Sequence, residues 1–181
     1  MCEVIFMSLK RAKTRIRALI RAEFSSINLR CVIIGALIVL FCGILSAFTG
    51  GSTASYRELE LPGFAPPAFI FPIVWTVLYI LIGGAAGAIA CSCERAREAD
   101  KYRGLLFFVI MMVFNFIWSP LFFGSGAYFA AFVAILMMIV LTFFIIGYFA
   151  RIYKVAAAVM VLYLLWIIFA AYLNLAVIIL N

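Results

Sequence analysis

The amino-acid sequence predicts an all-α membrane protein: a bundle of five transmembrane helices with a proline-rich lid loop between the first and second helices. Two observations predict this class. Hydrophobic residues make up 69% of the chain and charged residues 12%, whereas a soluble domain is roughly half apolar and a quarter charged. The charges are also clustered, so that four windows contain no Asp, Glu, Lys or Arg: residues 31–56, 61–93, 104–150 and 155–181. Each window is long enough to cross a bilayer.

The third window holds two spans. Its 47 residues would form roughly 70 Å of helix at about 1.5 Å per residue, about twice the hydrocarbon thickness of a bilayer. The segment from Gly124 to Gly126 reads Gly-Ser-Gly and supplies a turn. The expected helices are therefore residues 31–49, 68–90, 104–123, 127–149 and 155–180. The alternating ten-residue segments of a membrane β-barrel do not occur in the sequence.

The basic residues predict the orientation. With five spans, the N-terminus, the 91–103 loop and the 150–154 loop share one side of the membrane and hold 13 of the 14 Lys and Arg residues. Only Arg57 falls on the other side. The positive-inside rule therefore places the N-terminus in the cytoplasm. The short loops favour a multi-pass protein of a bacterial cell membrane.

The first 30 residues form a basic segment that precedes the five-helix domain of residues 31–181. On a helical projection of residues 9–24, apolar side chains gather on one side and basic ones mostly on the other. This pattern is typical of an interfacial helix attracted to anionic lipid. A solvated basic tail that only sets the topology explains the charges equally well.

Composition also excludes several functions. The basic residues that give the net charge of +7 flank the membrane spans. They are not accompanied by the aromatic side chains of a nucleic-acid-binding surface, so no nucleic-acid partner is expected. Histidine is absent and the spans hold no carboxylate, which argues against ion-coupled pumping, hydrolysis and a histidine-held metal or haem. No cofactor or metal is expected, and no catalytic residue of a conventional kind. The five cysteines show no disulfide framework.

Polar and large aromatic side chains inside the spans are the candidates for function. Asn115 and Asn174 carry amides that need partners in hydrocarbon, and either interhelical hydrogen bonding or ligand binding would supply them. Trp75 and Trp166 lie too far inside their spans for an interfacial belt. Tryptophans at such positions suit the wall of a cavity.

Glycines in the second span predict close helix packing. Gly83 and Gly87 are four residues apart, a spacing that lets two helices approach closely. The partner is either another helix of the same bundle or the same face of a second copy in a homodimer.

Prolines mark the start of the second span. Pro66 and Pro67 are tolerated only in the first turn of a helix, where a missing N–H has no partner to lose. Residues 52–68, with Tyr56, Phe64 and the prolines, are therefore expected to form a stiffened lid over the outward mouth of the bundle. A long ordered loop of this kind is usually functional.

Three stretches together resemble one family. They are YRELELPGFAPPAFIFPIVWTVLY, FNFIWSPLFFG and YLLWIIFAAYLNLAVIILN, and they resemble the TspO/MBR family of tryptophan-rich sensory proteins, related to the mitochondrial translocator protein or peripheral-type benzodiazepine receptor. The resemblance covers about residues 50–181, and the five-span pattern extends it to residue 31.

The resemblance implies a pocket beneath the loop between the first two helices. It would bind porphyrins, sterol-like lipids and isoquinoline or benzodiazepine ligands, and dimers occur in the family. Residues carried over by motif, together with the lid phenylalanine, are the predicted ligand-binding set: Tyr56, Phe64, Pro66, Trp75, Asn115, Trp118, Trp166, Ala170 and Asn174. In bacterial members, the tryptophans that Trp75 and Trp166 match are implicated in light-dependent porphyrin breakdown.

The sequence also departs from the family pattern. Ala68 and Phe69 stand where Arg-Trp is usual, which removes a partner for porphyrin propionates. Leu175 and Ile179 stand where the sterol-recognition pattern of animal members needs tyrosine and arginine. Sterol binding by that route is not expected.

Three functions follow as hypotheses. The favoured one is a membrane binding protein for a porphyrin or another flat hydrophobic molecule, acting in sensing or transport. The second is light-dependent degradation of porphyrin at the same pocket. The third is a structural membrane partner in which the lid aromatics and buried asparagines only pack.

Overall fold

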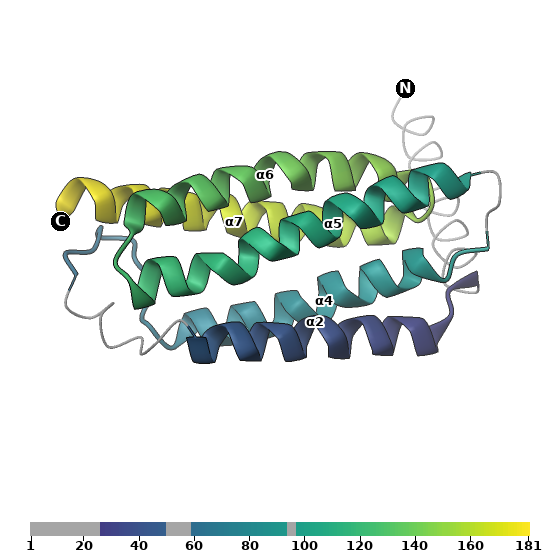
Figure 1. Ribbon diagram of the computed structural model, residues 1–181, viewed down its shortest axis with the longest axis horizontal. Helices are drawn as coiled ribbons and strands as arrows, with labels where there is room; N and C mark the ends of the chain where they lie inside the picture. Colours follow the sequence, from purple (N-terminus) through teal and green to yellow (C-terminus); the bar gives the residue numbers. More distant parts are fainter. Residues whose placement is uncertain (1–25, 50–58, 94–96) are drawn as a thin grey trace, which may run out of the picture.

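The computed structural model describes residues 26–49, 59–93 and 97–181. In this part of the chain there are five long helices and no strands: α2 (Leu29–Thr49), α4 (Ile70–Ala90), α5 (Glu98–Ser119), α6 (Tyr128–Ala150) and α7 (Lys154–Leu180). The helices run lengthwise side by side, with α2 and α4 together at one side of the bundle (Figure 1). All five are long and apolar enough to cross a membrane. The predicted five-helix membrane class is confirmed.

The turn between α5 and α6 is more ordered than the sequence suggested. A π-helical turn, η2 (Pro120–Gly124), extends α5 and closes with a hydrogen bond of 3.0 Å from Ser125 N–H to the Pro120 carbonyl. Gly126 then adopts a φ of 63°, which a residue without a Cβ adopts without strain. The chain reverses there and enters α6.

The glycines of α4 pack against α2. A Cβ on Gly83 would meet the carbonyl oxygen of Gly35 and would lie 2.9 Å from Cβ of Val39, while one on Gly87 would meet the backbone of Cys31. Only glycine permits so close an approach of the two backbones. The small-residue face is thus occupied within the chain, so it is not the seam of a homodimer.

A disulfide joins the same two helices at one end, contrary to the expectation of no disulfide framework. Cys31 lies in the first turn of α2 and Cys91 directly follows α4, and their sulfur atoms are 2.00 Å apart. The antiparallel pairing of α2 and α4 brings together two cysteines that are 60 positions apart in the sequence. Among the described cysteines, Cys42 and Cys93 are free thiols.

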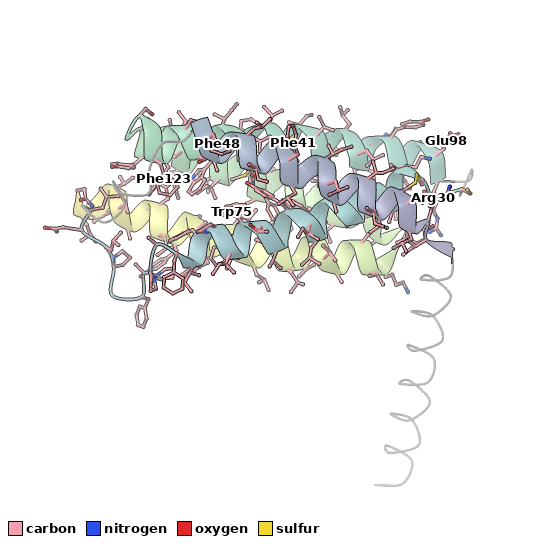
Figure 2. The ribbon with its side chains drawn as sticks, turned by 90° about the horizontal axis from the view of Figure 1, so that it is seen from below. Arg30, Phe41, Phe48, Trp75, Glu98 and Phe123 are labelled. Carbon is pink, nitrogen blue, oxygen red and sulfur yellow. A yellow bond between two sulfur atoms is a disulfide. The ribbon has the colours of Figure 1, made fainter. Side chains whose placement is uncertain are left out.

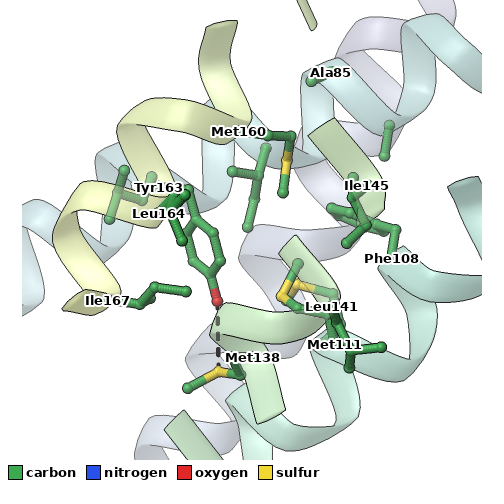
Figure 3. Packing of buried hydrophobic residues seen from close by; sticks show 14 of the residues in the cluster. Ala85, Phe108, Met111, Met138, Leu141, Ile145, Met160, Tyr163, Leu164 and Ile167 are labelled. Carbon is green, nitrogen blue, oxygen red and sulfur yellow. Dashed lines mark hydrogen bonds between the residues drawn. The ribbon is translucent and has the colours of Figure 1, made fainter. Parts of the chain in front are cut away.

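The centre of the bundle is a dry cluster of large side chains from α4, α5, α6 and α7. Tyr163, Met111, Met138 and Ile145 are each at most 1% exposed. Figure 3 shows the Tyr163 side chain reaching from α7 toward α6, where its hydroxyl donates to Sδ of Met138 at 3.5 Å. Apolar packing of this kind holds the helices in contact in a membrane.

Among the residues that the structure describes, basic side chains link the segments that meet at one end of the bundle. Arg151 after α6 pairs with Asp100 of α5 at 3.1 Å. Nζ of Lys101 donates to the Ser92 carbonyl at 3.2 Å, which ties the start of α5 to the end of α4. The assignment of this end to the cytoplasm stays a prediction. The amphipathic segment of residues 9–24 lies outside the described residues.

Candidate ligand-binding site

Trp75 of α4 is the centre of an aromatic cluster with side chains from three helices. Its ring centroid lies 5.4 Å from that of Tyr79 on the same helix, 5.9 Å from that of Trp118 on α5 and 6.5 Å from that of Tyr163 on α7. These separations are typical of attractive aromatic pairs. Residues 75 and 79 are one helical turn apart, so both rings leave the same face of α4.

Two of the cavities at this cluster have Phe71 and Trp118 in their walls. The larger has a volume of about 120 Å³ and is lined by Gly43, Ser46, Ala47, Phe71, Pro72, Trp75, Tyr79, Trp118, Ser119 and Phe123. The smaller has a volume of only about 10 Å³ and is lined by Phe71, Trp118, Phe122, Phe123, Ala170, Leu173, Asn174 and Val177. Of the predicted site residues, Trp75, Trp118, Ala170 and Asn174 thus line one or both cavities.

Phe71 lines the two cavities and was missed by the sequence interpretation. It lines both of them together with Trp118 and Phe123, and it is 8% exposed. Its ring also meets that of Trp166 edge to face, at 6.2 Å between centroids. A signal was present in the sequence, since residue 71 lies one helical turn before Trp75 and therefore on the same face of α4.

Asn115 lies beneath the aromatic cluster and connects three helices. Its Oδ1 accepts a hydrogen bond of 2.7 Å from the Tyr79 hydroxyl, and its Nδ2 donates one of 2.8 Å to the Tyr163 hydroxyl. Asn115 is 2% exposed and does not line either cavity. In this conformation its amide is used for interhelical bonding, one of the two roles that the sequence left open.

Asn174 makes a similar link nearer the lid end. Its Oδ1 accepts from Nε1 of Trp118 at 3.3 Å, and its Nδ2 donates to the Tyr128 carbonyl at 2.9 Å. The amide thereby fixes the orientation of the Trp118 indole, which forms a wall of both cavities.

Trp166 lies outside the lining of both cavities but keeps an unused donor. Its Nε1 is buried and has no hydrogen-bond partner in the part of the chain that the structure describes. Its ring contacts Phe71, and it contacts Phe169 at 5.6 Å between centroids. A buried N–H without a partner is unfavourable in apolar surroundings, so this indole is suited to donate to an acceptor that comes from outside.

The described part of the lid is tied to the end of α7. Nδ2 of Asn181 donates to the Glu60 carbonyl at 3.1 Å, and Oδ1 accepts from the Glu60 N–H at 3.0 Å. Phe64 is 84% exposed in this loop, and Pro66 is half-buried. Tyr56, the remaining predicted lid residue, lies outside the described residues.

Comparison with known proteins agrees with this architecture. The TspO/MBR family model matches residues 34–180, which include most of α2, the whole of α4 to α7 and the site. The chain belongs to the TspO/MBR family. It is accordingly a multi-pass membrane protein, as the five apolar helices indicate.

Several relatives within the TspO/MBR family are clearly similar to this chain. The tryptophan-rich protein TspO of Chlorobaculum tepidum is 34% identical over 70% of this chain and 78% of its own length. The protein of the same name from Archaeoglobus fulgidus is 34% identical over 82% of this chain and 94% of its own length. The tryptophan-rich sensory protein of Cereibacter sphaeroides is 31% identical over 66% and 72%.

Proposed function

We propose that this TspO/MBR protein binds a flat hydrophobic ligand, a porphyrin or related tetrapyrrole, for sensing or transport within the membrane. Drugs of the isoquinoline or benzodiazepine type and lipids are further candidate ligands for the same site. The names of several relatives as tryptophan-rich or sensory proteins agree with this proposal.

The observation that carries the proposal is the aromatic wall around the larger cavity. Phe71, Trp75 and Trp118 face this cavity from α4 and α5. Aromatic rings provide large contact areas for a flat ligand, and small-molecule sites are typically apolar with a few polar groups. The unpartnered Nε1 of Trp166 is one such group and would donate to a polar edge of the ligand.

Ligand binding requires this region to open. Small-molecule sites usually measure about 300–1,000 Å³, whereas the two cavities at the aromatic wall hold about 120 and 10 Å³. Phe71 lines both of them and contacts Trp166, so rotation of its ring would enlarge the space and bring the ligand close to Trp166. The loop of residues 59–69 leads into α4 just before Phe71, so a displacement of the loop would move this ring.

Titration with protoporphyrin IX in detergent, in the dark, tests the proposal. Saturable binding to the wild-type protein is expected, weakened in Trp75→Phe and in Phe71→Ala. Phe143→Leu is the matched control, because Phe143 is an exposed aromatic of α6 outside both cavities. Binding that is absent, or equally strong in all three variants, would contradict the proposal.

Photochemical degradation of the bound porphyrin is the second candidate function. Trp75 and Trp166 both lie near Phe71, so a ligand that displaces this ring would contact two oxidisable indoles. Illumination of the bound complex should then bleach the porphyrin absorption in the wild type and more slowly in Trp166→Phe. Bleaching at the same rate in Trp166→Phe, with binding intact, would rule out a role of this indole.

A further inference from the structure

A third cavity lies between α2 and α4 and is larger than either cavity at the aromatic wall. We propose that it is a binding site for one acyl chain of a membrane phospholipid, with the end of the chain against Trp75. We call this cavity the α2–α4 crevice. It has a volume of about 330 Å³ and is lined by Leu40, Gly43, Ile44, Ala47, Phe48, Pro72, Trp75, Thr76 and Tyr79. The proposal does not depend on porphyrin binding.

The crevice opens toward the bilayer. Phe48 is 82% exposed and Ile44 is 46% exposed, and both belong to a helix that the sequence places within the membrane. Figure 2 shows Phe48 on α2 and Trp75 on α4 toward the same end of the bundle, away from Arg30 and Glu98. The charge-free windows of the sequence include every lining residue. A lipid chain is therefore the molecule that this opening meets.

Small residues of α2 line the crevice beside the rings of α4. Gly43 and Ala47 lie in its wall together with Tyr79 and Trp75, and the Gly43 backbone lies so close to the Tyr79 ring that a Cβ would overlap it. The Tyr79 ring therefore packs directly on α2 at Gly43, and the crevice lies beside this contact. Nearer the disulfide, by contrast, Gly35 and Gly87 let the two backbones touch.

The hydroxyl groups in the wall of the crevice are already paired. The Thr76 hydroxyl donates to the Pro72 carbonyl at 2.7 Å, and the Tyr79 hydroxyl donates to Asn115 at 2.7 Å. Ser46, which lines the adjoining 120 Å³ cavity, donates to the Phe116 carbonyl at 2.7 Å. Because these hydroxyls need no further partner, a purely hydrocarbon occupant leaves none of them unsatisfied.

The crevice continues inward to the aromatic wall. Gly43, Ala47, Pro72, Trp75 and Tyr79 line both the crevice and the 120 Å³ cavity. A chain that enters from the bilayer between α2 and α4 therefore reaches the Trp75 ring. Residues of both α2 and α4 would hold the acyl chain in place. A lipid that only covers a smooth protein surface has no such defined position.

Photolabelling in phospholipid nanodiscs tests this proposal. The probe is a phosphatidylcholine with a diazirine near the end of one acyl chain, and the adducts are mapped by mass spectrometry. We expect adducts to concentrate on residues 72–79 and 43–48. Labelling there should fall on the order of tenfold in Ala47→Phe, because the new ring fills the crevice. Ala47 is exposed, so the substitution disturbs no buried packing.

The matched control is Ala158→Phe. Ala158 is an exposed alanine of α7 that lines none of the three cavities, and its substitution should leave the labelling pattern unchanged. Wild-type protein supplies a measurement that needs no variant: residues 72–79 should be labelled more strongly than the exposed residues Phe143 and Phe144 of α6. Even labelling of all exposed positions, or labelling of the crevice that Ala47→Phe does not reduce, would overturn the proposal.

Discussion

The hydroxyl of Tyr79 on α4 donates a hydrogen bond of 2.7 Å to Oδ1 of Asn115 on α5, within the apolar interior of the bundle. The same ring lines the α2–α4 crevice, while the other end of the amide holds the Tyr163 hydroxyl of α7. The Asn115 amide therefore fixes the Tyr79 and Tyr163 rings beside the site and links α4, α5 and α7.

Asn115→Ala should destabilise the protein by about 1–3 kcal/mol, because it removes the acceptor of the half-buried Tyr79 hydroxyl and the amide donor of the buried Tyr163 hydroxyl. Tyr79→Phe removes one donor and leaves the amide its bond to Tyr163, so its cost should be about 0.6–1.7 kcal/mol, the range for single interhelical hydrogen bonds in membranes. Thermal unfolding in detergent measures both. Thr142→Val is the control, since the Thr142 hydroxyl bonds only within its own helix, to the Met138 carbonyl. An Asn115→Ala protein as stable as this control would contradict the assigned role.

Gly83→Ala should weaken the contact between α2 and α4. The new Cβ would lie 2.9 Å from Cβ of Val39 and closer still to the Gly35 carbonyl, so the helices must separate. Overpacking of this kind costs about 1–3 kcal/mol, measured by thermal unfolding in detergent. Gly147→Ala is the same change where nothing lies within 4 Å of the added atom, and it should be neutral or slightly stabilising. Equal melting temperatures for the two variants would show that the close contact does not exist.

The Cys31–Cys91 disulfide should be detectable by thiol counting. Cys31 and Cys91 are paired, so a Cys2→Ser protein, which keeps only the four described cysteines, should take up two maleimide labels when unfolded without reduction and four after reduction. In the five-cysteine wild type, reduction should expose these two further thiols. Cys31→Ser should lower the free energy of unfolding by about 2–4 kcal/mol, as the loss of a cross-link over a long loop typically does. Cys42→Ser is the control, because Cys42 is a free thiol on α2. Five labels without reduction would contradict the pairing.

Asn181→Leu should release the loop of residues 59–69 from α7. The leucine keeps the size of the side chain but removes both hydrogen bonds to the Glu60 backbone. Amide hydrogen exchange around Glu60 should become faster, while exchange within α4 stays unchanged. Asn181→Asp keeps an acceptor for the Glu60 N–H but places an oxygen against the Glu60 carbonyl, so an intermediate effect is expected. Unchanged exchange in both variants would show that this pairing does not hold the loop.

The sequence predicted the helices well because their signal is local. Lipid excludes charged residues, so each charge-free window indicates at least one span. The boundaries of α4, α6 and α7 lie within two residues of the expected ones. The glycine turn before α6 was also visible, because a residue with positive φ is usually glycine. The family resemblance, confirmed by comparison, directed attention to Trp75 and Trp118.

The remaining features depend on which helix faces lie against each other, and apolar periodicity is a poor guide to this in membrane helices because lipid and protein interior are both apolar. Thus Asn115 was recognised as a residue that needs partners, but only the packing of α4, α5 and α7 supplied Tyr79 and Tyr163. The pairing of Cys31 with Cys91, and the space that Ala47 leaves beside Trp75, likewise exist only once α2 lies against α4. Composition and charge thus determined the class, the spans and the polar positions, whereas tertiary contact decided the disulfide, the partner of each amide and the shape of the cavities.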